Sequence, residues 1–415
     1  MPRSTRPLLI VVAGTDRVYR GYCLESVAAG YDIALIDTNP PTWQQHLLVD
    51  HETADTRDLE AVVAAGLALA ARHTVAGVLT WDEYALVPTA TLAARLGLPG
   101  ATPESMTCAR NKAASRAKFA EHGVPSAQST VVDSLPHATA VAHRTGFPVV
   151  LKPASHAASI GVIRVDRPEE LPSAWAFASA GAGGQGREGY GVLVEEYLSG
   201  PEISVECVTA GGITTPLAVT RKEVGFAPYF EETGHTVSAG DPLLPEVGPV
   251  AVQAVSALGI TDGVQHVEMR LTPAGPRIIE VNSRIGGDLI GRLVRLATGL
   301  DLPRIAADIA CGIGPSLAPT RKGTAAVKIL YAPATGTLSA RHLPVKPGVQ
   351  PPWLRQVAWL REVGDHVALP PQGDAGSARV GVFIVTADDP ARARARVDDL
   401  LGRLMLTVAS PDRRP

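Results

Sequence analysis

Short apolar runs alternate with longer amphipathic stretches along the first hundred residues. Continuous apolar runs rich in branched residues are typical of strands buried on both faces, and apolar spacing near 3.6 residues is typical of helices. The predicted strands are Leu8–Ala13, Ile33–Ile36 and Gly77–Thr80, and the predicted helices run to about Ala29 and over Leu59–Arg72 and Tyr84–Leu96. This alternation predicts an open parallel sheet with crossover helices.

The pattern changes after Pro103, where strands separated by turns become more frequent up to Arg284. The Gly-rich stretch Ala180–Gly191 predicts a mobile surface loop. A Pro-rich join over Gly314–Pro319 precedes a last block of mixed elements. The predicted elements are helix Asn111–His122, strands Pro148–Lys152 and Val162–Val165, a long helix from about Gly287, strands Ala325–Tyr331 and Val380–Thr386, and helix Pro390–Leu404.

Composition places the chain among globular proteins with a sizeable core. Of its 415 residues, 46% are apolar and 19% charged, and the net charge is -3. No basic excess therefore points to nucleic acid or to an anionic membrane surface. The longest apolar runs fall short of the ~20 residues that a membrane-spanning helix needs. Four widely spaced cysteines without a CxxC pair predict free thiols and a cytoplasmic location.

An acid near the end of the second predicted strand is one element of a dinucleotide-binding site. Asp37 ends that strand roughly 20 residues after Gly14. The glycines are Gly14 and Gly21, however, and do not form the GxGxxG pattern that brings the backbone against a pyrophosphate. The sequence therefore disfavours a nicotinamide cofactor.

The sharpest chemical signal is a predicted hairpin with acidic residues on both strands. Its turn is centred on Ala274, which places Glu268 opposite Glu280 and His266 opposite Asn282. Strand alternation puts Glu280 and Asn282 on one face. Two carboxylates facing each other repel unless a cation lies between them, and this set of hard oxygen ligands suits Mg²⁺. On the residues alone, a solvated polar hairpin face explains the pattern equally well.

Two further segments have features of a nucleotide site. An apolar strand delivers Lys152, and the small residues that follow, up to Gly161, allow backbone N–H groups to approach phosphate. Glu202 begins a strand after the Ser199–Pro201 turn and is suited to accept ribose hydroxyls. Taken singly, a hairpin with an incidental lysine and a solvated acidic hairpin are the competing interpretations.

Taken in order, these segments resemble the ATP-grasp superfamily, and within it the L-amino acid ligases, from about Pro7 to the C-terminus. The matching motifs are Asn111-Lys112, Val150-Leu151-Lys152-Pro153, Ser159-x-Gly161-Val162, Glu195-Glu196-Tyr197-Leu198-x-Gly200-x-Glu202, Glu268, and Glu280-Val281-Asn282-x-Arg284. The resemblance implies a multidomain α/β and α+β protein. Its parts are a Rossmann-like pre-ATP-grasp domain over 1–107, an ATP-grasp domain over 108–318, and a C-terminal lid-associated α+β domain over 319–415.

The resemblance also implies how ATP and metal are held. Mg²⁺, as two ions and replaceable by Mn²⁺, is expected on the hairpin. The implied ATP contacts are Lys112, Lys152, Ser159 and Lys222 to phosphates, Glu195, Tyr197 and Leu198 to adenine, and Glu202 to ribose, and the implied metal ligands are Glu268, Glu280 and Asn282.

The same resemblance implies the catalytic and substrate-binding residues. Arg284 is expected to steady the transferred phosphoryl group, together with Lys152. The implied substrate-binding residues are His235, His266, Arg284 and Gly287. His235 lies in a polar stretch that predicts a loop, and His156-Ala157-Ala158 replaces the Gly-rich phosphate loop of the family. Ser155–Gly161 is the predicted lid.

These features predict an ATP-dependent carboxylate–amine ligase that forms an amide or peptide bond through an acyl-phosphate and releases ADP and phosphate. Its partners are expected to be small-molecule acids and amines, one of them an amino acid, and the resemblance suggests a homodimer. An ATP-grasp carboxylase or purine-pathway ligase acting on bicarbonate or formate is the first alternative. A non-catalytic ATP-binding scaffold is the second, although such a protein has no need of the metal ligands.

Overall fold

A parallel sheet forms the N-terminal part of the computed structural model, which describes residues 6–14, 16–156, 159–184, 191–345 and 350–409. Its strand order is β3-β2-β1-β4, with every neighbouring pair parallel. The elements are β1 (Leu8–Val12), α1 (Arg17–Ala28), β2 (Asp32–Asp37), β3 (Asp50–Thr53), α2 (Leu59–Arg72), β4 (Val75–Thr80) and α3 (Leu86–Arg95). The predicted parallel sheet is confirmed, and the polar edge strand β3 adds to it.

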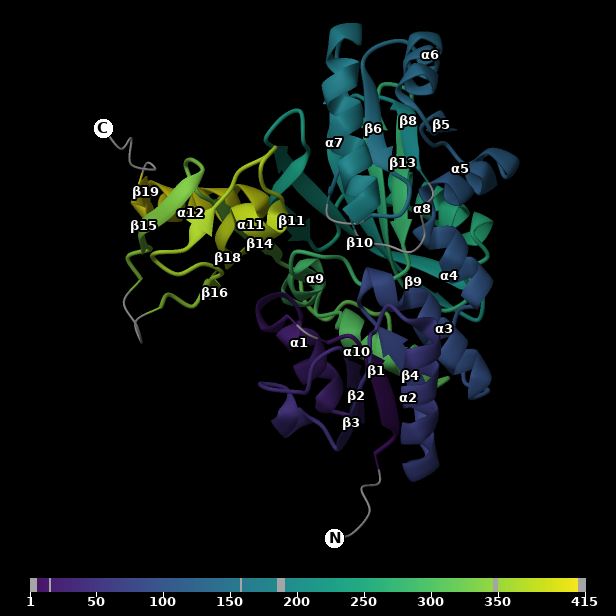
Figure 1. The fold of residues 1–415 in the computed structure, drawn as a ribbon. Helices are drawn as coiled ribbons and strands as arrows, with labels where there is room; N and C mark the ends of the chain where they lie inside the picture. Colours follow the sequence, from purple (N-terminus) through teal and green to yellow (C-terminus); the bar gives the residue numbers. More distant parts are fainter. Residues whose placement is uncertain (1–5, 15, 157–158, 185–190, 346–349, 410–415) are drawn as a thin grey trace.

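A small antiparallel sheet with two covering helices lies at the opposite end of the molecule (Figure 1). Its order is β5-β8-β6-β7, and α6 and α7 pack together against it. The elements leading to and forming this layer are α4 (Pro103–Arg110), α5 (Lys112–Glu121), β5 (Ser129–Val132), α6 (Leu135–Thr145), β6 (Val149–Pro153), β7 (Ile163–Val165), α7 (Leu171–Gly184) and β8 (Val192–Glu196).

An eight-stranded antiparallel sheet joins the middle of the chain to its C-terminal part. Its order is β13-β12-β9-β10-β11-β14-β18-β16. The elements are β9 (Glu202–Ala210), β10 (Ile213–Gly225), β11 (Glu231–Ser238), α8 (Leu244–Ala257), β12 (Gly263–Thr272), β13 (Gly275–Asn282), β14 (Thr324–Tyr331), β16 (Leu354–Trp359) and β18 (Arg379–Ala387). Helix α8 covers one face at β9, β10, β12 and β13.

The C-terminal part adds a helix and a small sheet to the end of this large sheet. Helix α12 (Pro390–Arg403) packs on β14 and β18, and the yellow block of Figure 1 shows it there. A small sheet of order β17-β15-β19 completes the block. The remaining elements are β15 (Gly336–His342), β17 (His366–Val367), α11 (Ala375–Ala378) and β19 (Met405–Ala409).

The sequence pattern left several helices unpredicted, among them α4, α6, α7 and α8, and it mispredicted the segments that begin at Ala180 and Gly287. Helix α8 lies in a region expected to contain only strands and turns, because Pro249 and several valines obscure its helical period. The expected long helix from Gly287 is instead α9 (Ile290–Thr298) and α10 (Leu302–Ala310), separated at Gly299, where φ is +83°. The first residues of the expected loop from Ala180 belong to α7, and residues 185–190 lie outside the described residues.

The predicted division into three domains is not tested by these elements and stays a prediction. The first boundary, after residue 107, falls within α4, and the second, before residue 319, precedes β14, which enters the large sheet. An apolar core cluster that includes Leu9, Val237, Leu293 and Val382 connects all three parts.

Candidate active site

A cavity of about 400 Å³ lies where the N-terminal sheet, the small antiparallel sheet and the large sheet meet. Such a volume is typical of a pocket for a cofactor or a small ligand. Thirteen of the fifteen predicted site residues line it: Lys112, Lys152, Ser159, Glu195, Tyr197, Leu198, Glu202, His266, Glu268, Glu280, Asn282, Arg284 and Gly287. Lys222 and His235 contact carboxylates that line it.

The acidic hairpin forms one wall of the cavity, in the register that the sequence predicts. Glu268 on β12 pairs with Glu280 on β13, and His266 pairs with Asn282. The Asn282 amide nitrogen lies 3.4 Å from a Glu268 oxygen. This set of oxygen donors, with two opposed carboxylates open to the cavity, fits Mg²⁺. Glu268, Glu280 and Asn282 would hold it, and the ion would neutralise phosphate charge.

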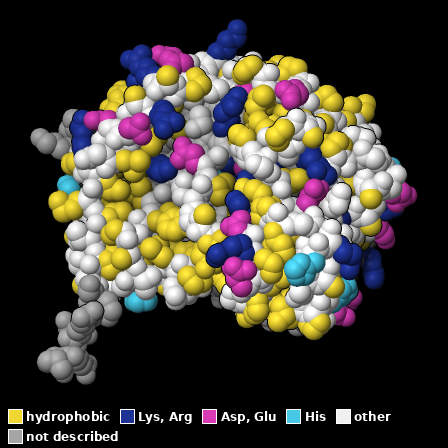
Figure 2. Space-filling view, turned by 90° about the horizontal axis from the view of Figure 1, so that it is seen from above, with side chains coloured by type: hydrophobic (Ala, Val, Ile, Leu, Met, Phe, Trp, Pro, Cys, Tyr) yellow, Lys and Arg dark blue, Asp and Glu magenta, His cyan; other side chains and the backbone are white. Residues whose placement is uncertain are grey.

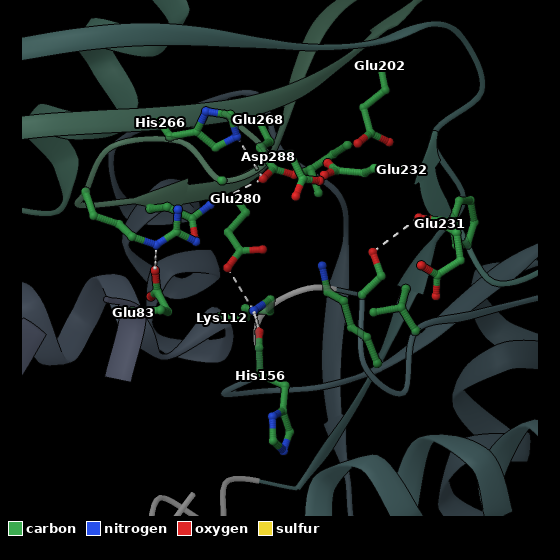
Figure 3. A pocket seen from close by; sticks show the side chains of 18 of the residues that line it. Glu83, Lys112, His156, Glu202, Glu231, Glu232, His266, Glu268, Glu280 and Asp288 are labelled. Carbon is green, nitrogen blue, oxygen red and sulfur yellow. Dashed lines mark hydrogen bonds and ion pairs between the residues drawn. The ribbon is translucent and has the colours of Figure 1, made fainter. Parts of the chain in front are cut away.

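A lysine side chain contacts Glu280, one of the two hairpin carboxylates. Lys112 Nζ lies 2.8 Å from Glu280, and Figure 3 shows this pair within the cavity. The same ammonium donates to the His156 carbonyl at 2.5 Å. Lys112 therefore links the hairpin to the start of the predicted lid.

A buried cluster of charged side chains holds Lys152, the second lysine that is expected to bind ATP. Lys152 Nζ lies 2.6 Å from Glu195, and Arg116 donates to both oxygens of the same carboxylate at 2.9 and 3.2 Å. Burial lowers the pKa of Lys152, and Glu195 opposes that effect. The Glu195 side chain is thus engaged with two cations, and the expected adenine contact at this position stays a prediction. Arg116 lies one helical turn after Lys112 and therefore on the same side of α5. Its spacing from a predicted ATP-binding lysine is the feature of the sequence from which its place in the cavity could have been predicted.

Aromatic and basic side chains surround the segment expected to hold adenine. Arg164 lies 4.2 Å and Arg270 5.7 Å from the centre of the Tyr197 ring. Arg270 also donates to Glu202 at 2.8 and 3.1 Å. Tyr197 and Leu198 line the cavity beside Val150, which gives this end an apolar surface suited to a flat base.

Lys222 is buried among three carboxylates. Its ammonium contacts Glu202 at 3.3 Å and Glu268 at 3.2 Å and also pairs with Glu232, while the side chain is 1% exposed. Burial acts to lower the pKa of Lys222, but the three carboxylates outweigh it and raise that pKa well above its ordinary value. Lys222 is therefore a buried member of this charge cluster, and the expected phosphate contact stays a prediction.

His235 lies on a buried strand and not in the polar loop that the sequence predicted. Its side chain on β11 is fully covered, with Nε2 3.4 Å from Glu232 and 3.6 Å from Asp288. The polar residues around it suggested a loop because they face a cavity instead of solvent. Asp288 in turn accepts two hydrogen bonds from Arg379, at 2.6 and 2.9 Å.

Arg284 is held from the N-terminal part of the chain. Its Nε lies 2.8 Å from the carboxylate of Glu83, and its guanidinium donates to Asn282 at 3.3 Å. Burial acts to lower the pKa of Arg284, but the negative charges of Glu83 and of the hairpin carboxylates outweigh it. The pKa of Arg284 is therefore raised above its ordinary value. Glu83, which is labelled in Figure 3, therefore positions Arg284 beside the hairpin.

His156 contacts the N-terminal part of the chain. Its Nδ1 lies 3.2 Å from the Tyr84 hydroxyl. Ser159, with φ of +56°, donates to the Phe230 carbonyl at 3.2 Å. These two residues flank the middle of the predicted lid, Ala157-Ala158, which lies outside the described residues.

His266 is expected to remain protonated at neutral pH. Burial acts to lower its pKa, but Glu206, at 2.9 and 3.0 Å, and Glu268, at 3.1 Å, raise it to about 9. In the metal-free protein, NMR titration of the imidazole should give a midpoint near that value instead of the ordinary ~6.5. The isosteric change Glu206→Gln should lower the midpoint, because it removes the negative charge that does most to raise the pKa of the imidazole. An unchanged midpoint would contradict this assignment.

Several residues of the cavity were missed. Most of them come from parts of the chain distant from the predicted motifs, whereas Glu231, Glu232 and Asp288 lie within four residues of the predicted site residues His235 and Gly287. The missed residues are Asp16, Tyr19, Arg20, Glu83, Glu231, Glu232, Asp288 and Arg379.

The face of the molecule in Figure 2 carries Lys and Arg side chains interspersed with Asp and Glu side chains. In the described part of the chain, no helix is both long and apolar enough to cross a bilayer.

Comparison with known proteins shows the kind of fold to which this cavity belongs. Residues 145–292 match the family model described as ATP-grasp domain. The crystal structure of L-amino acid ligase from Bacillus licheniformis superposes with a TM-score of 0.82 at 22% identity, covering 98% of this chain and 100% of that chain. This likeness confirms the predicted ATP-grasp fold.

Two curated proteins are similar in sequence. An uncharacterised protein of Sinorhizobium fredii is 32% identical over 288 residues, which are 68% of this chain and 59% of that protein. Carnosine synthase 1 of Homo sapiens is 28% identical over 348 residues, 77% of this chain and 42% of that protein. The matched part of the chain thus spans about half of the length of these relatives.

Proposed function

We propose that the chain is an ATP-dependent ligase of the ATP-grasp superfamily that joins a carboxylate to an amine. The observation that carries the proposal is the wall formed by Glu268, Glu280, Asn282 and Arg284 beside Lys112 and Lys152. Similarity to carnosine synthase and the fold shared with an L-amino acid ligase support an amide product.

The reaction proposed transfers the γ-phosphoryl group of ATP to a carboxylate oxygen, giving an acyl-phosphate and ADP. The amine then attacks the acyl carbon, the C–O bond to phosphate breaks, and the amine loses a proton. Such chemistry depends on positioning and charge neutralisation, which explains a site rich in Lys, Arg and carboxylates. Lys112, Lys152 and Arg284 would face the phosphates.

The finer parts of the proposal follow the family resemblance. They are two Mg²⁺ ions on the hairpin, with Mn²⁺ as a substitute, an amino acid among the substrates, a homodimer and a cytoplasmic location. The screen described next is designed to identify the acid and the amine.

A screen of acid and amine pairs for ADP release tests this function. We expect amine-dependent ADP and phosphate, a condensed product in mass spectrometry, and a hydroxamate when hydroxylamine replaces the amine. Formation of AMP and pyrophosphate without ADP would overturn the proposal. Incorporation of ¹⁴C-bicarbonate would instead support a carboxylase, and tight ATP binding without turnover would support a scaffold.

A further inference from the structure

Three buried side chains in the cavity wall carry more positive than negative charge. Arg116 on α5 and Lys152 on β6 both contact the Glu195 carboxylate on β8, Arg116 at 2.9 and 3.2 Å and Lys152 at 2.6 Å. The exposed fractions are 7% for Arg116 and 4% for both Lys152 and Glu195. Within the described residues, neither cation pairs with a second carboxylate. Two cations therefore share one anion.

Burial makes this excess of positive charge costly. Although burial favours its neutral form, Arg116 and Lys152 hold the pKa of Glu195 below its ordinary value, so Glu195 already carries its full negative charge. Burial lowers the pKa of Lys152, and the positive charge of Arg116 adds to this effect. All three side chains line the cavity, so a bound anion can supply the missing negative charge. In the proposed function that anion is the triphosphate of ATP.

The two cations are held unequally. The Arg116 guanidinium donates to both oxygens of Glu195 and also to the Ile279 carbonyl on β13, at 2.6 Å. The Lys152 ammonium contacts Glu195 alone among the described side chains. An ammonium on a flexible stem can turn to another acceptor, whereas a guanidinium held on two sides loses several hydrogen bonds if it turns. Lys152 is therefore the cation that can move from Glu195 to a phosphate.

Release of Lys152 is easier when a second cation stays on the carboxylate. Without Arg116, Lys152 and Glu195 would form a neutral pair, and a phosphate would have to break that pair and leave a buried carboxylate uncompensated. We propose, taking from the function proposed above only that the chain binds ATP, that Arg116 is a positioning residue that keeps Glu195 neutralised and so makes Lys152 available to the phosphates.

The contribution of the phosphates to nucleotide affinity tests this role. Titration calorimetry of the full chain with Mg²⁺ measures the affinities for β,γ-imido-ATP and for adenosine, and the ratio of the two reports the phosphates. Arg116→Met removes the charge and leaves Lys152 and Glu195 as a neutral pair, so the fold should be retained. We expect this change to lower the ratio by about tenfold or more, as for the loss of hydrogen bonds to charged groups, while adenosine affinity stays within about twofold.

The same substitution in a Glu195→Gln background identifies how Arg116 acts. With no negative charge at that position, nothing retains Lys152, so Arg116→Met should then change the ratio by less than about twofold. A direct contact between Arg116 and a phosphate would instead give the same loss in both backgrounds. Such a contact is the main alternative, because Arg116 Nη1 is buried without a hydrogen-bond partner in the described part of the chain.

Lys118→Met is the matched control, because Lys118 lies on the same helix and its ion pair with Glu121 is exposed. It should leave the ratio unchanged. Arg116→Lys keeps a positive charge beside Glu195 and should lower the ratio less than Arg116→Met does. A purely structural role for Arg116 would weaken the binding of β,γ-imido-ATP and of adenosine equally, and that result would overturn the proposal.

The measurements separate this role from the ligase function. A wild-type ratio in Arg116→Met, or an equal loss in both Glu195 backgrounds, would overturn the role of Arg116 while the ligase stands. The expected ratios without turnover of any acid–amine pair would support the role and overturn the ligase. A wild-type protein that binds β,γ-imido-ATP no more tightly than adenosine would overturn both.

Discussion

Glu280→Gln should lower kcat/KM for amine-dependent ADP release by about 100-fold or more, which is the size of effect expected when a charge-stabilising group is removed from an active site. Glu280 faces Glu268 across the hairpin and contacts Lys112 at 2.8 Å. The amide keeps the shape of the side chain and an oxygen for Lys112 but has no negative charge for a divalent ion. Loss of rate should therefore come from the metal-dependent step.

Coupled-enzyme assays over a range of Mg²⁺ concentrations measure this effect. The concentration of Mg²⁺ that gives half-maximal rate should rise, while affinity for an ATP analogue without metal should stay near the wild-type value. Glu246→Gln, an exposed acid on α8, is the control and should behave as wild type. Wild-type activity in Glu280→Gln would show that this carboxylate is not a metal ligand.

The hairpin shows what the sequence alone could predict. Its two strands are adjacent in the chain and joined by a short turn, so alternation and turn position give the approximate register. Counting residues back from Ala274 places Glu268 opposite Glu280, and the structure confirms this pair. The turn itself joins Thr272 to Gly275, and a shift of register between Glu268 and Met269, which the sequence did not predict, brings the two glutamates opposite each other. The first strands were predicted equally well, because strands buried on both faces have a strong apolar signal.

Residues brought together by long-range packing could not be predicted in this way. Arg379 reaches Asp288 from a strand 91 residues later in the chain, and Glu83 reaches Arg284 from the N-terminal part. No local pattern records which distant strand becomes a neighbour. Local polarity was also misleading at His235, because polar residues around a buried cavity have the same pattern as a solvated loop.

Lys222→Met should lower the free energy of unfolding by about 3–5 kcal/mol, the cost of removing one partner from a buried ion pair. The change leaves the Glu202, Glu232 and Glu268 carboxylates close together without the cation that separates them. Methionine matches the length of the lysine side chain, so the loss comes from charge and not from a cavity. Denaturant unfolding of the metal-free protein measures the difference.

The pH dependence of that difference identifies its cause. Although burial favours their neutral forms, Lys222 holds the pKa values of Glu232 and Glu268 well below the ordinary range in the folded protein. Their contribution to stability is therefore present above the pKa of ~4.5 that an unfolded chain shows, and it is lost as the pH falls through the lower folded values. The gap between wild type and Lys222→Met should consequently be widest near neutral pH and narrow in acid. Lys118→Met, which removes an exposed pair with Glu121, should leave the free energy of unfolding close to that of the wild type. A gap that stays constant from neutral to acid pH would mean that lost packing, and not charge, destabilises the variant.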